Sequence, residues 1–183
     1  MFTADYCRCQ FDGNDADPGP SNQAVEAMTN ISGFDPDGRT AVVDLTDAYA
    51  LNRGVTRRFT LPADYTQLVI TDRVDPERSN DGAAATMTMS WSMHTYADIT
   101  VDPDGRGATL VQKGRRLRAT VGAAEKSLPG RFTAVDLNIT SLPSNQTTKF
   151  NASPGLRKLV FDSPRVASIE VTLRLSPVVE LLS

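Results

Sequence analysis

The chain has 183 residues, of which 40% are hydrophobic and 22% are charged, with a formal net charge of −3 at pH 7. This length and composition suit one globular domain and exclude an intrinsically disordered chain. The mildly acidic balance gives no electrostatic reason to expect nucleic acid or an anionic membrane surface as a partner. No apolar run approaches the length that spans a bilayer, so we expect no membrane association either.

Residues 1–39 are predicted to be irregular. The stretch 11–20, FDGNDADPGP, consists largely of turn-forming and acidic residues. The first seven residues lack the basic and apolar regions of a signal peptide, so we expect none in this chain. Cys7 and Cys9 are separated by one residue, and no disulfide framework can be built from this pair. They are either free thiols or a partner for a cysteine elsewhere in a longer parent protein.

From residue 40 onward the hydrophobic residues recur with a period of two, which is typical of β-strands. Residues 41–46 alternate, Phe59 and Leu61 follow two arginines, and residues 67–71 form a short apolar strand. The clearest alternation covers residues 86–94, TMTMSWSMH, where the methionines and the tryptophan share one face and the polar residues share the other. This segment is predicted to be a strand with one buried and one polar face.

The rest of the chain continues the pattern. Residues 102–105, DPDG, predict a turn, and strands are expected at 108–112 and 117–121. Residues 122–155 are predicted to be rich in loops, with three candidate hydrophobic anchors. Strands at 158–162 and 168–175 complete the domain. The three anchors are Phe132, Val135 and Leu137.

Short strands separated by turns, with no helical periodicity between them, predict an all-β fold: an antiparallel two-layer β-sandwich with little helix. The sandwich is expected to occupy residues 40–183 as one domain, preceded by the irregular segment 1–39. The side chains expected in its core are Met87, Met89, Trp91, Met93, Ile169, Val171 and Leu173.

Four tripeptides match the acceptor pattern for N-glycosylation, and they begin at Asn30, Asn138, Asn145 and Asn151. The last is followed by Pro154, which weakens it as an acceptor. The three that fall within residues 138–153 predict an exposed segment and a secretory history. We therefore expect a secreted or periplasmic location, as part of a longer precursor, with Asn30, Asn138 and Asn145 as glycosylation sites.

Four segments, in this order, resemble the carboxy-terminal β-sandwich of heparinase II/III-like polysaccharide lyases. VVDLTDAY (42–49) is similar to the strand that opens that region. RRFTLPADYTQLVITDRV (57–74) is similar to the family's arginine-aromatic strand and the following hydrophobic strand that ends in aspartate. WSMHT (91–95) resembles its aromatic-x-x-His-Thr strand, and KLVFDSPRVASIEVTLRLSP (158–177) resembles its final hairpin.

The resemblance implies a module of an enzyme that degrades uronic-acid polysaccharides by β-elimination. In that reaction a base removes the proton beside the uronate carboxyl group while other groups neutralise the carboxylate. The family supplies most of these groups from a helical toroid and a His-x-His-x-Asp segment, and this sequence has neither. We therefore expect a fragment that is inactive by itself, whose partner is the polysaccharide or the missing N-terminal part of a lyase. The alternative is a non-enzymatic carbohydrate-binding or structural sandwich.

His94 is the only histidine in the sequence, and Tyr96 lies two residues later, on the same face of the predicted strand. They are the candidate catalytic pair, and the alternative interpretation is that His94 makes structural hydrogen bonds on the polar face of its strand. One histidine cannot form the usual zinc site without help from carboxylates or thiols. No compact acidic cluster accompanies it, so no metal and no cofactor are expected.

Two groups of basic residues stand out in the sequence. Arg57 and Arg58 are adjacent in a strand, so their side chains point to opposite faces, and one of them can pair with an acid such as Asp72. Arg115, Arg116 and Arg118, with Lys113 beside them, form a basic cluster. It is either a site for a uronate or sulfated chain or a set of solvated positions on a hairpin.

Overall fold

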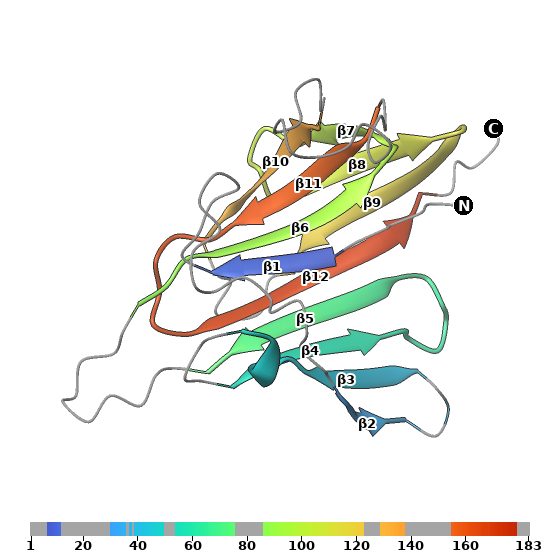
Figure 1. Cartoon of the computed structure of the whole chain (residues 1–183). Helices are drawn as coiled ribbons and strands as arrows, with labels where there is room; N and C mark the ends of the chain where they lie inside the picture. The colour runs from blue at the N-terminus through green and yellow to red at the C-terminus, as the bar shows by residue number, and fades with distance from the viewer. Residues whose placement is uncertain are drawn as a thin grey trace, which may run out of the picture.

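The computed structural model describes residues 7–11, 30–35, 37, 39–49, 54–75, 86–122, 129–137 and 155–178. These form two antiparallel sheets (Figure 1). The strands are β1 (Cys7–Phe11), β2 (Asn30–Phe34), β3 (Thr40–Asp44), β4 (Val55–Thr60), β5 (Leu68–Val74), β6 (Met89–Thr95), β7 (Asp98–Val101), β8 (Gly107–Gln112), β9 (Arg115–Val121), β10 (Arg131–Asp136), β11 (Arg157–Asp162) and β12 (Ile169–Pro177). A single 3-10 helix, η1 (Thr46–Ala48), is the one helical element in the described part of the chain.

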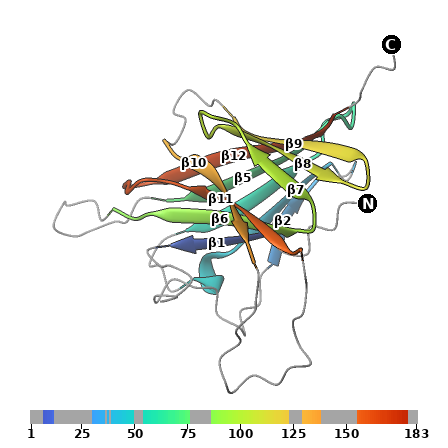
Figure 2. The same ribbon diagram turned by 90° about the horizontal axis from the view of Figure 1, so that it is seen from above.

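The small sheet has the strand order β1-β6-β11-β10, and the large sheet has the order β2-β3-β4-β5-β12-β9-β8-β7. Figure 2 shows β1 and β6 of the small sheet on one side of the molecule and β12 and β9 of the large sheet on the other. The predicted antiparallel two-layer β-sandwich with little helix is therefore confirmed. Consecutive described strands belong to different sheets at β1 and β2, β5 and β6, β6 and β7, β9 and β10, and β11 and β12.

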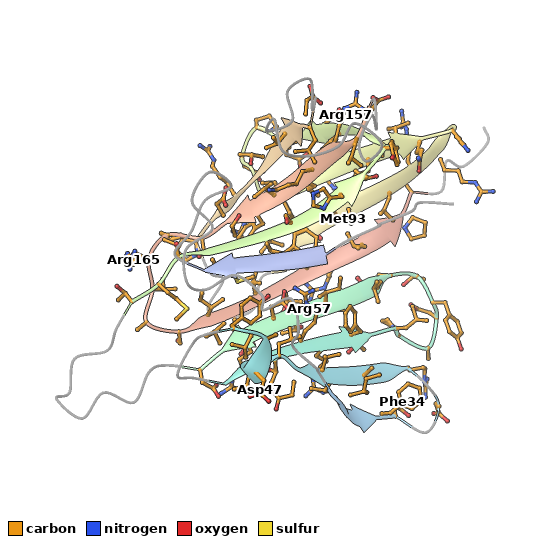
Figure 3. All side chains as sticks on the ribbon, viewed as in Figure 1. Phe34, Asp47, Arg57, Met93, Arg157 and Arg165 are labelled. Atoms are coloured by element: carbon orange, nitrogen blue, oxygen red, sulfur yellow. The ribbon has the colours of Figure 1, made fainter. Side chains whose placement is uncertain are left out.

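The two sheets meet most closely at the edge formed by β7 and β10. The Phe132 N–H of β10 donates to the Gly105 carbonyl in the turn before β8, at 2.8 Å. Arg157 of β11 forms ion pairs with Asp98 of β7 at 3.0 Å and with Asp136 of β10 at 3.1 Å (Figure 3). The contacts of Phe132 with Gly105 and of Arg157 with Asp98 join the edges of the two sheets, whereas the ion pair with Asp136 lies within the small sheet.

The core lies between the sheets and follows the period of two. Trp91 of β6 is 0% exposed, and the opposing strand β12 contributes four buried side chains, Ile169, Val171, Leu173 and Leu175. All seven predicted core residues are buried, and so is the predicted anchor Phe132. Val135 is 38% exposed, so its predicted role as an anchor is wrong.

The other face of β6 is less open than its polar sequence predicts. Ser92 is 6% exposed, and Ser90 and His94 are half-buried. The reason is that β6 is an interior strand of the small sheet, with β1 on one side and β11 on the other. A single strand's pattern cannot reveal how many neighbours flank it.

Two predictions about irregular segments need correction. β1 and β2 lie within residues 1–39, which the sequence predicts as irregular, and β10 lies within the predicted loop region 122–155. These short strands are specified by their partners: β1 pairs with β6, β2 with β3, and β10 with β11. In β2, the register shift between Ile31 and Phe34 also interrupts the period of two.

Replacing Trp91 with alanine is expected to lower the free energy of unfolding by about 3–5 kcal/mol, because the indole is fully enclosed in the core. Urea denaturation followed by circular dichroism measures this change. Tyr65→Ala serves as the control, because Tyr65 is 66% exposed and its truncation is expected to change stability by less than about 1 kcal/mol. Equal effects from the two substitutions would contradict the assignment of Trp91 to the core.

Candidate ligand-binding groove

The outward face of the large sheet is polar, whereas its inward face forms one wall of the core. On β4, Val55 and Arg57 are buried while Arg58 is exposed. On β12, Glu170 is exposed and lies between two buried neighbours in the sequence. Because successive side chains of a strand point to opposite faces, the outward face is built from every second residue of each strand.

Arg57 points inward and forms a buried ion pair with Asp72 of β5, its cross-strand neighbour. The Nε–H donates to Oδ1 at 2.6 Å and an Nη2–H donates to Oδ2 at 2.9 Å, so the contact is bidentate. The two side chains are 7% and 5% exposed. The prediction that one of the two adjacent arginines pairs with Asp72 is confirmed, and Arg57 is labelled in Figure 3 beside β5.

Arg58 consequently points to the outward face, where it lines an open groove of about 420 Å³. Its cross-strand neighbours are Val42 of β3 and Thr71 of β5. The second row of the groove runs from Thr56 of β4 through Arg73 of β5 to Glu170 of β12. The residues that line the groove are Val42, Thr56, Arg58, Thr71, Arg73, Asp75 and Glu170.

The groove combines hydrogen-bond donors with acceptors. Arg73 forms an exposed ion pair with Asp75 at 2.9 Å, and Thr71 shares a hydrogen bond with Thr172 at 3.2 Å. Within the part of the chain that the structure describes, neither the Arg58 guanidinium nor the Glu170 carboxylate has a hydrogen bond or ion pair. The groove therefore presents one guanidinium and one carboxylate that are available to a ligand.

Farther across the outward face, two arginines lie flat against glycines. A Cβ placed on Gly122 would lie 1.8 Å from the Arg174 guanidinium, and one placed on Gly107 would lie 2.2 Å from that of Arg118. A side chain at either glycine would therefore displace the guanidinium that lies over it. Arg118 also donates to Asp102 at 2.8 Å and to Thr109 at 3.2 Å.

The residues of the predicted basic cluster lie in two different environments, one paired with an acid and one exposed. Arg118 is engaged with Asp102, and its hydrogen bond lowers the pKa of the Asp102 carboxyl below its ordinary value of 3.8. Arg115 and Arg116 are exposed at the start of β9, next to the tight turn at Lys113 and Gly114. These residues lie away from the groove, because Glu170 lines the groove near the start of β12, whereas Leu117 and Arg118 of β9 pair with Pro177 and Ser176 at the end of β12.

The candidate catalytic residues lie on the other sheet. His94 of β6 is half-buried, and its cross-strand neighbour is Lys158 of β11. Tyr96 is 40% exposed and follows the last residue of β6, so it belongs to the bend before β7. The expectation that His94 and Tyr96 share one strand face is therefore wrong.

The described residues include only one of the asparagines of the glycosylation tripeptides. Asn30 is the first residue of β2, whereas Asn138, Asn145 and Asn151 lie outside the described residues. Among the described side chains, no group of three or more His, Cys, Asp and Glu residues gathers as a metal site would. No helix in the described ranges is long and apolar enough to cross a membrane.

The chain matches no protein-family model and no curated protein. The resemblance to heparinase II/III-like lyases therefore remains an expectation that rests on the four segments quoted above.

Removing one partner of the Arg57–Asp72 pair is expected to destabilise the fold strongly, because the other charge is left buried. Arg57→Ala or Asp72→Ala should each lower the free energy of unfolding by about 3–5 kcal/mol, measured by urea denaturation. Replacing both, as Arg57→Met with Asp72→Leu, should cost far less. The matched control is Arg58→Ala, expected within about 0.5 kcal/mol of the wild type because Arg58 is exposed. Similar losses for Arg57→Ala and Arg58→Ala would contradict this account.

Asp102→Asn is expected to lower the melting temperature at pH 7 by removing the charged partner of Arg118. The pKa of Asp102 is lowered in the fold, so its stabilising contribution is present above pH 3.8 and is lost as the pH falls through the folded pKa. The melting temperatures of wild type and variant should therefore converge as the pH falls below 3.8, as recorded by differential scanning fluorimetry. Asp47→Asn, at an exposed position of η1, is the control. A constant difference at every pH would show that the effect is not electrostatic.

Proposed function

We propose that this chain is a β-sandwich module that binds a uronic-acid polysaccharide, like the carboxy-terminal sandwich of the heparinase II/III-like lyases that it resembles, and that it carries out no elimination by itself. The observation that carries this proposal is the open groove on the large sheet, with an available guanidinium and carboxylate beside threonine hydroxyls. Sugars present both hydroxyl donors and acceptors, and uronates add a carboxylate. Such a ligand uses every polar group type in the groove.

The positions of the four resembling segments support the comparison with a sandwich module. Residues 42–49 contain most of β3 and all of η1, and residues 57–74 form the β4–β5 hairpin around its buried ion pair. Residues 91–95 are the centre and end of β6, and residues 158–177 contain β11, the crossing between the sheets, and β12. Each segment thus coincides with regular elements that make up the core.

The separation of the polar groups argues against elimination by the chain alone. A base and a carboxylate-neutralising group must act together on one sugar, because each supplies only part of the reduction in the barrier. His94 is on the small sheet, whereas Arg58 is on the outward face of the large sheet, with the core between them. In a complete lyase the missing groups would come from another part of the protein, and the module would hold the polysaccharide or support that part.

This function agrees with a secreted or periplasmic location and with glycosylation, which the acceptor tripeptides predict. A structural sandwich that only spaces domains is the second candidate. It differs from the proposal in one observable property, because it binds no polysaccharide.

We expect the chain to be retarded in native gels that contain polygalacturonate or alginate, and to migrate freely in gels that contain neutral dextran. Absence of retardation by every uronate tested would contradict the proposed function and favour a structural role.

In the same mixtures, the ultraviolet absorbance of unsaturated uronate is expected to stay at the level of the blank. Clear turnover by the chain alone, abolished by His94→Ala or Tyr96→Phe, would show that it carries its own active site.

A further inference from the structure

We infer that the groove on the large sheet binds one uronate unit, with the sugar carboxylate on Arg58 and its hydroxyls on Glu170 and the threonines, and that it selects unsulfated over sulfated chains. This inference rests on the proposed polysaccharide-binding function and adds the site, the contact made by each residue and the class of polysaccharide.

Arg58 is the carboxylate-binding group because it is the exposed cation of the groove without an internal partner. Arg73, the other arginine there, has its Nε bonded to Asp75. Asp75 is itself held in place, because its N–H donates to the Gly54 carbonyl at 3.0 Å. A guanidinium presents a planar set of donors that matches a carboxylate in two parallel hydrogen bonds. The buried pair of Arg57 holds the strand in the register that keeps Arg58 outward.

Glu170 supplies the acceptor that sugar hydroxyls need. It lies directly across from Arg73 in the sheet, and its carboxylate is exposed. Thr56 and Thr71 add hydroxyls that can donate or accept, and Val42 adds an apolar surface for the C–H face of a ring. A carboxylate beside the cation is unfavourable for a ligand that carries only negative groups, but it is useful for one that also donates hydrogen bonds.

The preference for unsulfated chains follows from the number of charged groups in the groove. The groove contains two arginines and two carboxylates, and the Arg73–Asp75 pair is internally compensated. One positive and one negative group therefore remain for the ligand. A uronate unit with one carboxylate satisfies Arg58 and still offers hydroxyls to Glu170. Sulfate esters in place of those hydroxyls would remove the donors and bring further anions toward Glu170, which is repulsive.

The size and openness of the groove suit one unit of a longer chain. A volume of about 420 Å³ is at the lower end of the range for small-molecule sites. Arg174 lies farther along the same face on β12, where it covers Gly122. A polysaccharide that leaves the groove across the sheet would pass this second cation.

The test measures affinity by isothermal titration calorimetry for polygalacturonate, carboxyl-reduced polygalacturonate and heparin, at one low salt concentration. The variants are Arg58→Ala, Arg58→Lys and Glu170→Gln, with Arg115→Ala as the matched control on an exposed arginine outside the groove. Arg58→Ala is expected to weaken binding of polygalacturonate by about tenfold or more, because a charge-assisted bidentate contact is lost. Arg58→Lys should recover part of this loss, and Arg115→Ala should change the affinity less than about twofold. Unfolding curves of each variant confirm that the fold is retained.

Two further results separate this site from general attraction between charges. Wild-type chain should bind carboxyl-reduced polygalacturonate at least about tenfold more weakly than polygalacturonate. Glu170→Gln should strengthen the binding of heparin relative to polygalacturonate, because it removes the repelling charge and keeps an acceptor.

The outcomes distinguish the two proposals. If the wild type binds polygalacturonate but Arg58→Ala binds as tightly, the groove is not the site, while the proposed function stands. If Arg115→Ala weakens binding as much as Arg58→Ala, attraction is nonspecific and the inference is overturned. Preference of the wild type for heparin would contradict the predicted selectivity. If the wild type binds none of the three ligands, the proposed function fails and the inference fails with it.

Discussion

The pairing of Arg57 with Asp72 constrains the part of the sheet that carries the groove. Among the described residues these are the two buried charged side chains, and each would be strongly unfavourable in the interior without the other. Because they are direct cross-strand neighbours, their contact specifies the register of β4 against β5. A shift of that register by one residue would carry one charge to the outward face and leave the other unpaired. The ion pair thus determines which arginine is buried and which is presented to solvent.

Much of the fold could be predicted from the period of two, whereas the connections between sheets could not. The alternation of apolar residues in β6 predicts a buried strand face, whichever sheet the strand belongs to. Its members are Met89, Trp91 and Met93, and all three are buried. The sequence of β6 does not show that its neighbours are β1 and β11, since β1 is only five residues long and is followed by turn-forming residues. Pairing of this kind depends on tertiary contacts between segments far apart in the chain, so local patterns carry little information about it.

The candidate site, too, could be predicted from the sequence only in part. Adjacent arginines in a strand must point to opposite faces, so the sequence already predicts one arginine paired with an acid and one free. The sequence does not show which arginine is buried and which is exposed, because that depends on which face of β4 packs against the core. The sequence does not predict the contribution of Glu170 to the groove. Glu170 lies beside Arg73 only because β12 pairs with β5, and almost one hundred residues of chain separate the two. Its alternation with Ile169 and Val171 indicates only that it is exposed.

The glycines on the outward face show how this surface remains both polar and smooth. Gly107 and Gly122 leave space that the guanidinium groups of Arg118 and Arg174 occupy, so these long side chains lie along the sheet rather than project from it. A polymer bound on an open face of this kind, as we propose, would remain in contact with water on one side. Hydrogen bonds to such a ligand are adequate for recognition, whereas abstraction of a weakly acidic proton needs an enclosed site in which charges act at low dielectric strength. Elimination on a polymer bound there would therefore need an enclosing wall from outside the described residues of these two sheets.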